Sequence, residues 1–97
     1  MNIRWTVEGR SDRDHILQTI AEESPLSAAA IDELFSSSLQ NIAAFPRMGK
    51  PGMIDGTREF IVHENYRIVY QVESDSITVS AITHTSRQWR PVLASLS

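Results

Sequence analysis

Residues 58–83, "REFIVHENYRIVYQVESDSITVSAIT", decide the fold. Three runs in this stretch are rich in aromatic and β-branched side chains, and short polar segments separate them. Such runs favour strands, and polar clusters between them favour tight turns. The stretch therefore predicts strands at residues 58–62, 66–72 and 77–83, joined as an antiparallel meander.

A segment rich in glycine and proline precedes the meander. Residues 46–56, "PRMGKPGMIDG", hold two prolines and three of the four glycines of the chain. This composition is typical of a loop, and the segment is too short to serve as a linker to a second domain. We therefore expect a single domain that spans residues 1–97.

A long helix is predicted before this loop. Ser24-Pro25 combines a good N-cap residue with a proline at the first helical position. From Leu26 to Ala43, apolar residues recur at helical spacing and form one stripe. Phe45-Pro46 then stops the pattern, so this helix is expected to end near Ala44.

The N-terminal part predicts one strand and one more helix. Apolar and polar residues alternate from Ile3 to Val7, which indicates a strand, and Gly9 is expected to end it. Ser11 and Asp14 have the spacing of a capping box, so a helix is expected over residues 12–23. The short break before the second helix makes the two helices antiparallel neighbours.

The predicted order is therefore β-α-α-β-β-β. The helical hairpin must bury its apolar stripe, so it is expected to pack on one face of a mainly antiparallel four-stranded sheet. This is a two-layer α+β fold. The other face of the sheet is expected to be free, or to be covered by a partner.

Composition excludes several classes of protein. With 9 Lys+Arg against 12 Asp+Glu, the net charge is −3, which disfavours broad binding to nucleic acid. The chain has no cysteine and only three scattered histidines, so we expect no disulfide, no metal site and no cofactor. No apolar run suits a signal peptide or a membrane span. A soluble, cytoplasmic protein without membrane contact is expected.

The charges are not evenly distributed along the chain. Acidic residues dominate residues 8–33, whereas most of the cations lie between residues 47 and 90. A local basic patch on a mildly acidic body is therefore expected in the C-terminal half.

Several motifs in this half resemble the RelE/ParE superfamily of bacterial toxins from type II toxin–antitoxin pairs. The matching pieces are a P-x-x-G-x-x-G loop at residues 46–52, Gly56-Thr57-Arg58-Glu59, Tyr66-Arg67-Ile68-Val69-Tyr70, and His84-x-x-Arg87-x-Trp89. The predicted order of elements is also that of the superfamily. The resemblance implies one of two activities: cleavage of mRNA on the ribosome without a metal, as in the RelE-like branch, or inhibition of DNA gyrase, as in the ParE-like branch.

Metal-free RNA cleavage needs a base, an acid and cations that stabilise the developing charge. By resemblance, Arg67 and Arg87 would be the cations of such a ribosome-dependent mRNA endonuclease. The tail after Arg87 contains no Tyr or His, so His84 or His63, with Glu59 as the base, would have to replace the usual groups. This is a non-standard set.

The acidic composition, the G-T-R-E junction and the H-x-x-R-x-W ending favour the ParE-like branch instead. On this interpretation the chain is a gyrase inhibitor and not an enzyme. Its candidate contacts with the target or the antitoxin are Arg47, Lys50, Arg58, Arg67, Arg87 and Trp89. A degenerate member that only binds its antitoxin remains a further alternative.

Ordinary structural roles compete with these functional roles. Arg67 lies in an apolar strand and can pair with Glu59 or Glu73 across the sheet. Arg58 next to Glu59 is more commonly part of a solvated cross-strand pair. A histidine at a strand end, such as His84, usually bonds the backbone, and Trp89 is more commonly a residue that packs the tail against the sheet.

A cognate antitoxin is the partner that the resemblance implies. A segment that folds on binding, as a helix in a groove or as an added strand, would cover the free sheet face. Operator DNA would then be reached only through the antitoxin.

Overall fold

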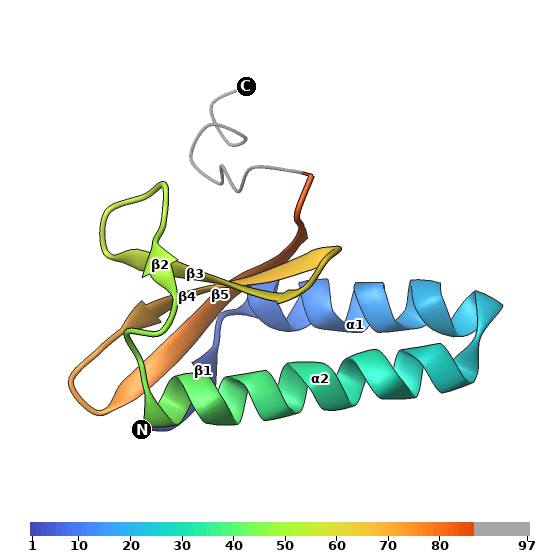
Figure 1. Cartoon of the computed structure of the whole chain (residues 1–97), viewed down its shortest axis with the longest axis horizontal. Coiled ribbons are helices and arrows are strands. Elements are labelled where there is room, and N and C mark those ends of the chain that lie inside the picture. Colours follow the sequence, from blue (N-terminus) through green and yellow to red (C-terminus); the bar gives the residue numbers. More distant parts are fainter. Residues whose placement is uncertain (87–97) are drawn as a thin grey trace.

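A computed structural model describes residues 1–86 as two helices on one face of a five-stranded sheet (Figure 1). The elements in chain order are β1 (Asn2–Trp5), α1 (Val7–Glu23), α2 (Pro25–Ala44), β2 (Lys50–Pro51), β3 (Thr57–His63), β4 (Tyr66–Val72) and β5 (Ser76–His84). The strands are arranged in the order β1-β5-β4-β3-β2, in which β1 is parallel to β5 and the other neighbours are antiparallel. The predicted α+β class, helical hairpin and meander are confirmed.

The sheet has one strand more than the four predicted. Lys50 and Pro51, inside the expected loop, pair with Glu59 and Arg58 of β3. No periodic pattern can mark a strand of two residues, so the sequence did not reveal it. The limits of β4 are those predicted, and β3 and β5 each extend one residue further at both ends.

Helix α1 begins at Val7, five residues before the predicted start. Its N-cap is Thr6, whose Oγ1 accepts a hydrogen bond from the Gly9 amide at 2.9 Å. The same hydroxyl lies within hydrogen-bond distance of the Val79 and Ser80 carbonyls in β5. The predicted capping box at Ser11 is therefore wrong, because a contact with a distant strand fixes the start of the helix at Thr6.

Gly9 lies inside α1 and does not end a strand. A Cβ at this position would lie 2.5 Å from the carbonyl oxygen of Val79, so only glycine allows the helix to approach β5 this closely. Glycine costs about 1 kcal/mol in a helix interior relative to alanine. The close packing of α1 on β5 that glycine allows offsets this cost.

The hydrophobic core lies between the helices and the sheet. Helix α2 contributes Phe35, Leu39 and Ile42, which are almost fully buried. The facing side chains of the sheet are Ile68, Tyr70, Ile77, Val79 and Ile82. Neither helix within residues 1–86 has the combination of length and apolarity needed to cross a membrane.

Arg13 of α1 connects three elements around this core. Its guanidinium lies 2.6 Å from the Asp32 carboxylate of α2 and 5.4 Å from the centre of the Trp5 ring of β1. The acidic N-terminal region thus places one of its few cations in an interhelical ion pair. Trp5 also packs against the core.

Beyond the last residue that pairs with β1, the backbone of β5 is hydrogen-bonded by a side chain of α1. Pairing between β1 and β5 ends at Trp5 and Val79. Further along, the Asp12 carboxylate accepts a hydrogen bond from the Ile82 amide at 3.1 Å. This contact satisfies a strand amide that has no partner strand on that side.

Replacing Asp12 by alanine is expected to lower the free energy of unfolding by about 1 kcal/mol, because the Ile82 amide loses its acceptor. Asp12→Asn keeps an acceptor and is the matched control, which should unfold at nearly the same urea concentration as wild type.

Burial raises the pKa of Asp12 above 3.8. Protonation therefore favours the folded state, and wild type should gain stability relative to Asp12→Asn as the pH falls from neutrality through this raised pKa. A pH-independent difference would contradict this assignment.

The two faces of the sheet differ because side chains alternate along each strand. Tyr66, Ile68 and Tyr70 face the helices, whereas Arg67 and Val69 point to the opposite side, called the second face below. From the sequence, this face was expected to be free or to be covered by a partner, and the side chains at its centre are buried. The side chains of Val69 and Ala81 are buried there, as are those of Thr57 and Glu59.

Candidate functional site

The residues predicted to form a site lie in three separate places. Arg47, Lys50 and Arg58 surround the loop after α2, Arg67 and Glu59 lie on the second face, and His84 lies on the helix side of β5. Arg87 and Trp89 fall outside the described residues 1–86.

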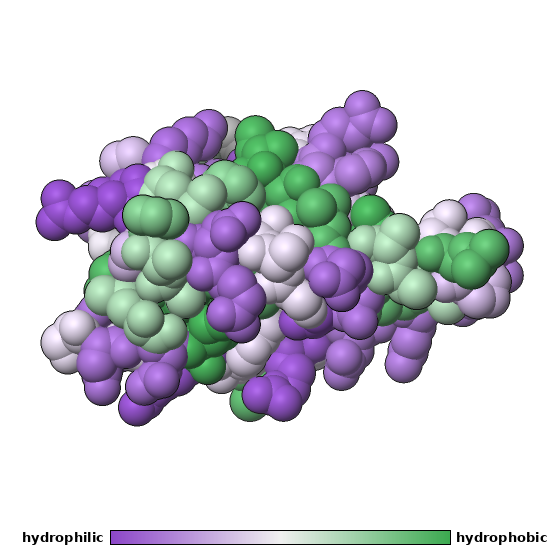
Figure 2. Space-filling model, turned by 60° about the horizontal axis from the view of Figure 1, so that its bottom comes forward, coloured by the Kyte–Doolittle hydropathy of each residue, from purple (hydrophilic) through white to green (hydrophobic). Residues whose placement is uncertain are grey.

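Apolar and cationic side chains are exposed together after α2. Phe45 is 70% exposed and Met48 is 40% exposed, although both belong to residue types that are usually buried. Arg47 and Lys50 are exposed beside them in sequence. Figure 2 shows apolar and polar atoms intermixed at the end of the molecule where α2 terminates. We call Phe45, Arg47, Met48, Lys50 and Arg58 the loop surface.

Tyr70 anchors this loop to the sheet. Its hydroxyl donates a hydrogen bond to the Pro46 carbonyl at 2.7 Å and accepts one from the Gly49 amide at 3.0 Å. Burial of the ring and hydroxyl raises the pKa of Tyr70 above 10.0, although the Gly49 hydrogen bond and nearby Arg58 act in the opposite direction. The two ends of residues 46–49 are therefore fixed by one buried side chain of β4.

Further side chains of β3 hold the rest of the loop. The Arg58 guanidinium donates to the Gly49 carbonyl at 2.6 Å, and its distance to the Arg47 carbonyl is 3.4 Å. The Thr57 hydroxyl donates to the Ile54 carbonyl at 2.6 Å, and the Glu59 carboxylate accepts from the Met53 amide at 3.3 Å. The loop is thus bonded to the sheet along most of its length.

Arg67 is held within the second face. Its guanidinium lies 2.9 Å from the Glu59 carboxylate, and it also donates to the Thr83 hydroxyl and the Thr85 carbonyl, each at 3.2 Å. Only 15% of the Arg67 side chain and 8% of the Glu59 side chain are exposed. Of the two partners that the sequence left open for Arg67, the structure places Glu59 against it.

Arg58 and Glu59 do not form the solvated pair that the sequence suggested. Arg58 pairs in register with Tyr70 and lies on the helix side, where it bonds the loop. Glu59 points to the second face and is buried with Arg67. Neighbouring positions of a strand point to opposite faces, so the two side chains are directed apart.

His84 lies on the helix side of β5. Its ring meets the Tyr66 ring edge-on, with centroids 5.9 Å apart, and Tyr66 in turn contacts Phe35 of α2. Its Nδ1 accepts a hydrogen bond from the Ser86 amide at 3.1 Å. His84 therefore bonds the backbone, and the sheet separates it from Arg67 and Glu59.

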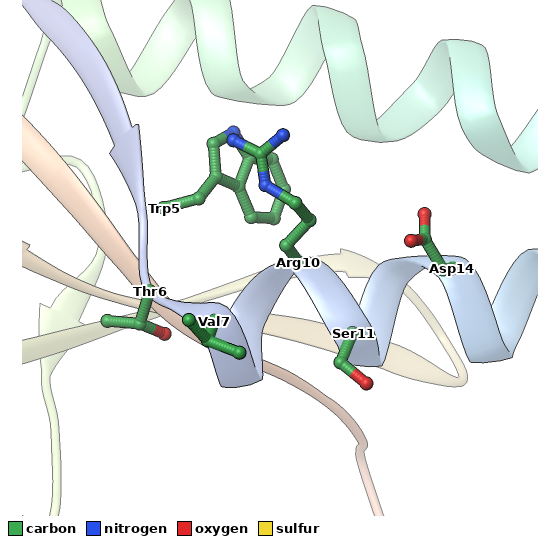
Figure 3. Close-up of a pocket in the computed structure, with 6 residues that line it drawn as sticks. All are labelled: Trp5, Thr6, Val7, Arg10, Ser11 and Asp14. Atoms are coloured by element: carbon green, nitrogen blue, oxygen red, sulfur yellow. The ribbon is translucent and has the colours of Figure 1, made fainter.

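The described residues also form a shallow pocket at the junction of β1 and α1 (Figure 3). Its volume is about 330 Å³, and it is lined by Trp5, Thr6, Val7, Arg10, Ser11 and Asp14. The sequence did not single out this pocket, because its lining comes from a strand end and one helix face. Within residues 1–86, no three His, Asp or Glu side chains lie close enough together to share a metal ion.

Sequence reasoning missed three residues of the loop region. Tyr70 was placed in a strand without a role of its own, Phe45 was taken as a helix stop, and Met48 was not considered. A tyrosine in place of phenylalanine at a buried strand position is a signal that its hydroxyl has a partner. Nothing in the sequence indicates that Phe45 is exposed.

Comparisons with known proteins agree with this architecture. The family model described as "ParE toxin of type II toxin-antitoxin system, parDE" matches residues 3–89. The chain is 30% identical over 92 residues to "Putative toxin Y4kP" of Sinorhizobium fredii, a match that covers 94% of this chain and 95% of that protein. Two solved structures share the fold. One belongs to the chromosomal ParDE system of P. aeruginosa, with a TM-score of 0.73, 18% identity, and coverage of 87% of this chain and 95% of that one. The other is a YoeB/ParE toxin of Agrobacterium tumefaciens, with a TM-score of 0.66, 20% identity, and coverage of 87% and 98%.

Proposed function

From the premise that this chain belongs to the ParE toxin family of type II toxin–antitoxin systems, we propose that it acts by inhibiting DNA gyrase. The inhibition is non-enzymatic: the toxin binds its target and cleaves no RNA. Its proposed contacts with gyrase or with the antitoxin are Arg47, Lys50, Arg58, Arg67, Arg87 and Trp89, as expected from the sequence.

One observation supports gyrase over the ribosome as the target. A ribonuclease needs its acid, its base and its cations around one phosphate. Here Arg67 and Glu59 are bonded to each other on the second face, whereas His84 contacts Tyr66 on the helix side. The residues that the ribonuclease interpretation would combine are therefore directed to opposite faces. The net charge of −3 also suits ribosomal RNA poorly.

Purified toxin added to purified gyrase tests this function directly. The expected result is a dose-dependent loss of DNA supercoiling, with no cleavage of mRNA in a parallel reaction on translating ribosomes. Codon-phased cleavage on the ribosome, with unaffected supercoiling, would identify the alternative, a RelE-like mRNA endonuclease. Absence of both activities would indicate a degenerate toxin and would also refute the proposal.

As a member of a toxin–antitoxin family, the protein has an antitoxin as its partner. We propose that operator DNA is bound only through this antitoxin and that the complex is cytoplasmic. A gel-shift experiment with operator DNA should therefore show no specific complex with the toxin alone and a specific complex when the antitoxin is added.

A further inference from the structure

We propose that the loop surface is a preformed docking site for an acidic protein segment that carries an apolar anchor side chain. The proposal concerns binding by Phe45, Arg47, Met48, Lys50 and Arg58. Membership of a toxin–antitoxin family is used only to identify the antitoxin as the protein that supplies this segment. The proposal does not depend on gyrase being the target.

The backbone of the loop is held in place by the sheet. Four side chains of β3 and β4 bond its backbone: Thr57, Arg58, Glu59 and Tyr70. Yet Phe45 and Met48 remain 70% and 40% exposed. A loop whose backbone is fixed while large apolar side chains stay exposed loses little conformational entropy when a partner binds.

The exposed residues of the loop surface are of types that are common in protein–protein interfaces. Phe45, which is 70% exposed, lies three positions before Met48, and Arg47 lies between them in the sequence. Aromatic residues, methionine and arginine are enriched in protein–protein interfaces, and scattered single apolar residues would not combine in this way. A partner side chain that covers Phe45 would bury apolar area on both molecules.

Charge identifies the chemistry of the partner. The loop surface has three positive charges, on Arg47, Lys50 and Arg58. Residues 46–56 contain one acidic residue, Asp55, and the nearby Glu59 is paired with Arg67. This local excess contrasts with the net charge of −3 for the whole chain. Carboxylates beside an apolar anchor would complement such a surface, whereas the phosphate backbone of a nucleic-acid duplex would leave Phe45 and Met48 without an apolar partner.

Selection from a random peptide library displayed on phage tests the proposal. The full-length toxin is the bait, and a Phe45→Ser/Met48→Ser variant removes peptides that bind elsewhere. The expected result is enrichment of peptides that combine Asp or Glu with an aromatic or aliphatic residue. A synthetic copy of the enriched peptide should then bind about 30-fold more weakly to Phe45→Ser than to wild type. Lys50→Glu should weaken binding about tenfold and reduce its salt dependence.

Two matched controls lie away from the loop surface. Leu26→Ser removes an apolar side chain that is 85% exposed at the start of α2, and Arg4→Glu reverses an exposed charge on β1, at the opposite edge of the sheet from β2. Both should bind the peptide as wild type does. Three outcomes would refute the proposal. They are enrichment of basic or purely polar peptides, equal enrichment on the double variant, and preferential binding of a 20-base-pair DNA duplex to the loop residues. The peptide-binding measurement uses neither gyrase nor ribosomes, so its result can be interpreted even if the toxin does not inhibit gyrase.

Discussion

Replacing Arg67 by alanine is expected to lower the free energy of unfolding by about 3–5 kcal/mol. The reason is that Glu59, of which 8% is exposed, would keep a buried negative charge without its counterion. The hydroxyl of Thr83 and the carbonyl of Thr85 would also lose a donor. Since a domain of this size has a total stability of about 5–15 kcal/mol, the loss is a large fraction of the whole. Thermal unfolding followed by circular dichroism should show a midpoint lower by more than about 12 °C.

The double variant Glu59→Met/Arg67→Met is the control for this prediction. It removes both charges and retains two long side chains, so its stability should lie within about 1–2 kcal/mol of wild type. A single Arg67→Ala variant as stable as wild type would show that the pair is solvated and contributes little. The double variant also separates two roles of Arg67. A folded protein that no longer inhibits gyrase would assign the Glu59–Arg67 pair to the target contact, and retained inhibition would restrict the role of Arg67 to the sheet.

Tyr70→Phe should lower the free energy of unfolding by about 2–6 kcal/mol, since the Gly49 amide and the Pro46 carbonyl both lose a partner, at about 1–3 kcal/mol for each group. The variant retains the ring, so the packing of the core should be unchanged. Released from its anchor, the loop should present Phe45 and Arg47 in many orientations. The affinity for a peptide selected on the loop surface should therefore fall, which calorimetry at a temperature where the variant is folded can measure.

The pH dependence provides a second readout for Tyr70. Its pKa is raised above 10.0 in the folded protein, so the neutral side chain stabilises the fold below that value. As the pH rises above 10, the unfolded state ionises first, and this contribution is lost as the pH passes through the raised folded pKa. Wild type should lose this stability in alkaline urea titrations, and Tyr70→Phe should not. Parallel alkaline curves for the two proteins would contradict the assignment.

Local patterns predicted most of the fold. The limits of β4 and the N-cap of α2 at Ser24 agree with the structure, because alternation and capping are set by residues close together in the chain. The predicted start of α1 was wrong because contacts with a distant strand, and not nearby residues, determine it. Thr6 caps the helix while contacting Val79 and Ser80, more than 70 residues away in sequence.

The sequence by itself determined the succession of strands and helices, the family resemblance and the position of most of the cations between residues 47 and 90. Only the tertiary structure decided which of those cations act together. Arg58 and Arg67 lie on adjacent strands but on opposite faces, and a single buried hydroxyl, that of Tyr70, determines where the loop with Arg47 and Lys50 lies. The physical reason is that the composition of a segment governs its local conformation, whereas the grouping of side chains into a surface depends on strand register and on contacts between segments distant in the chain.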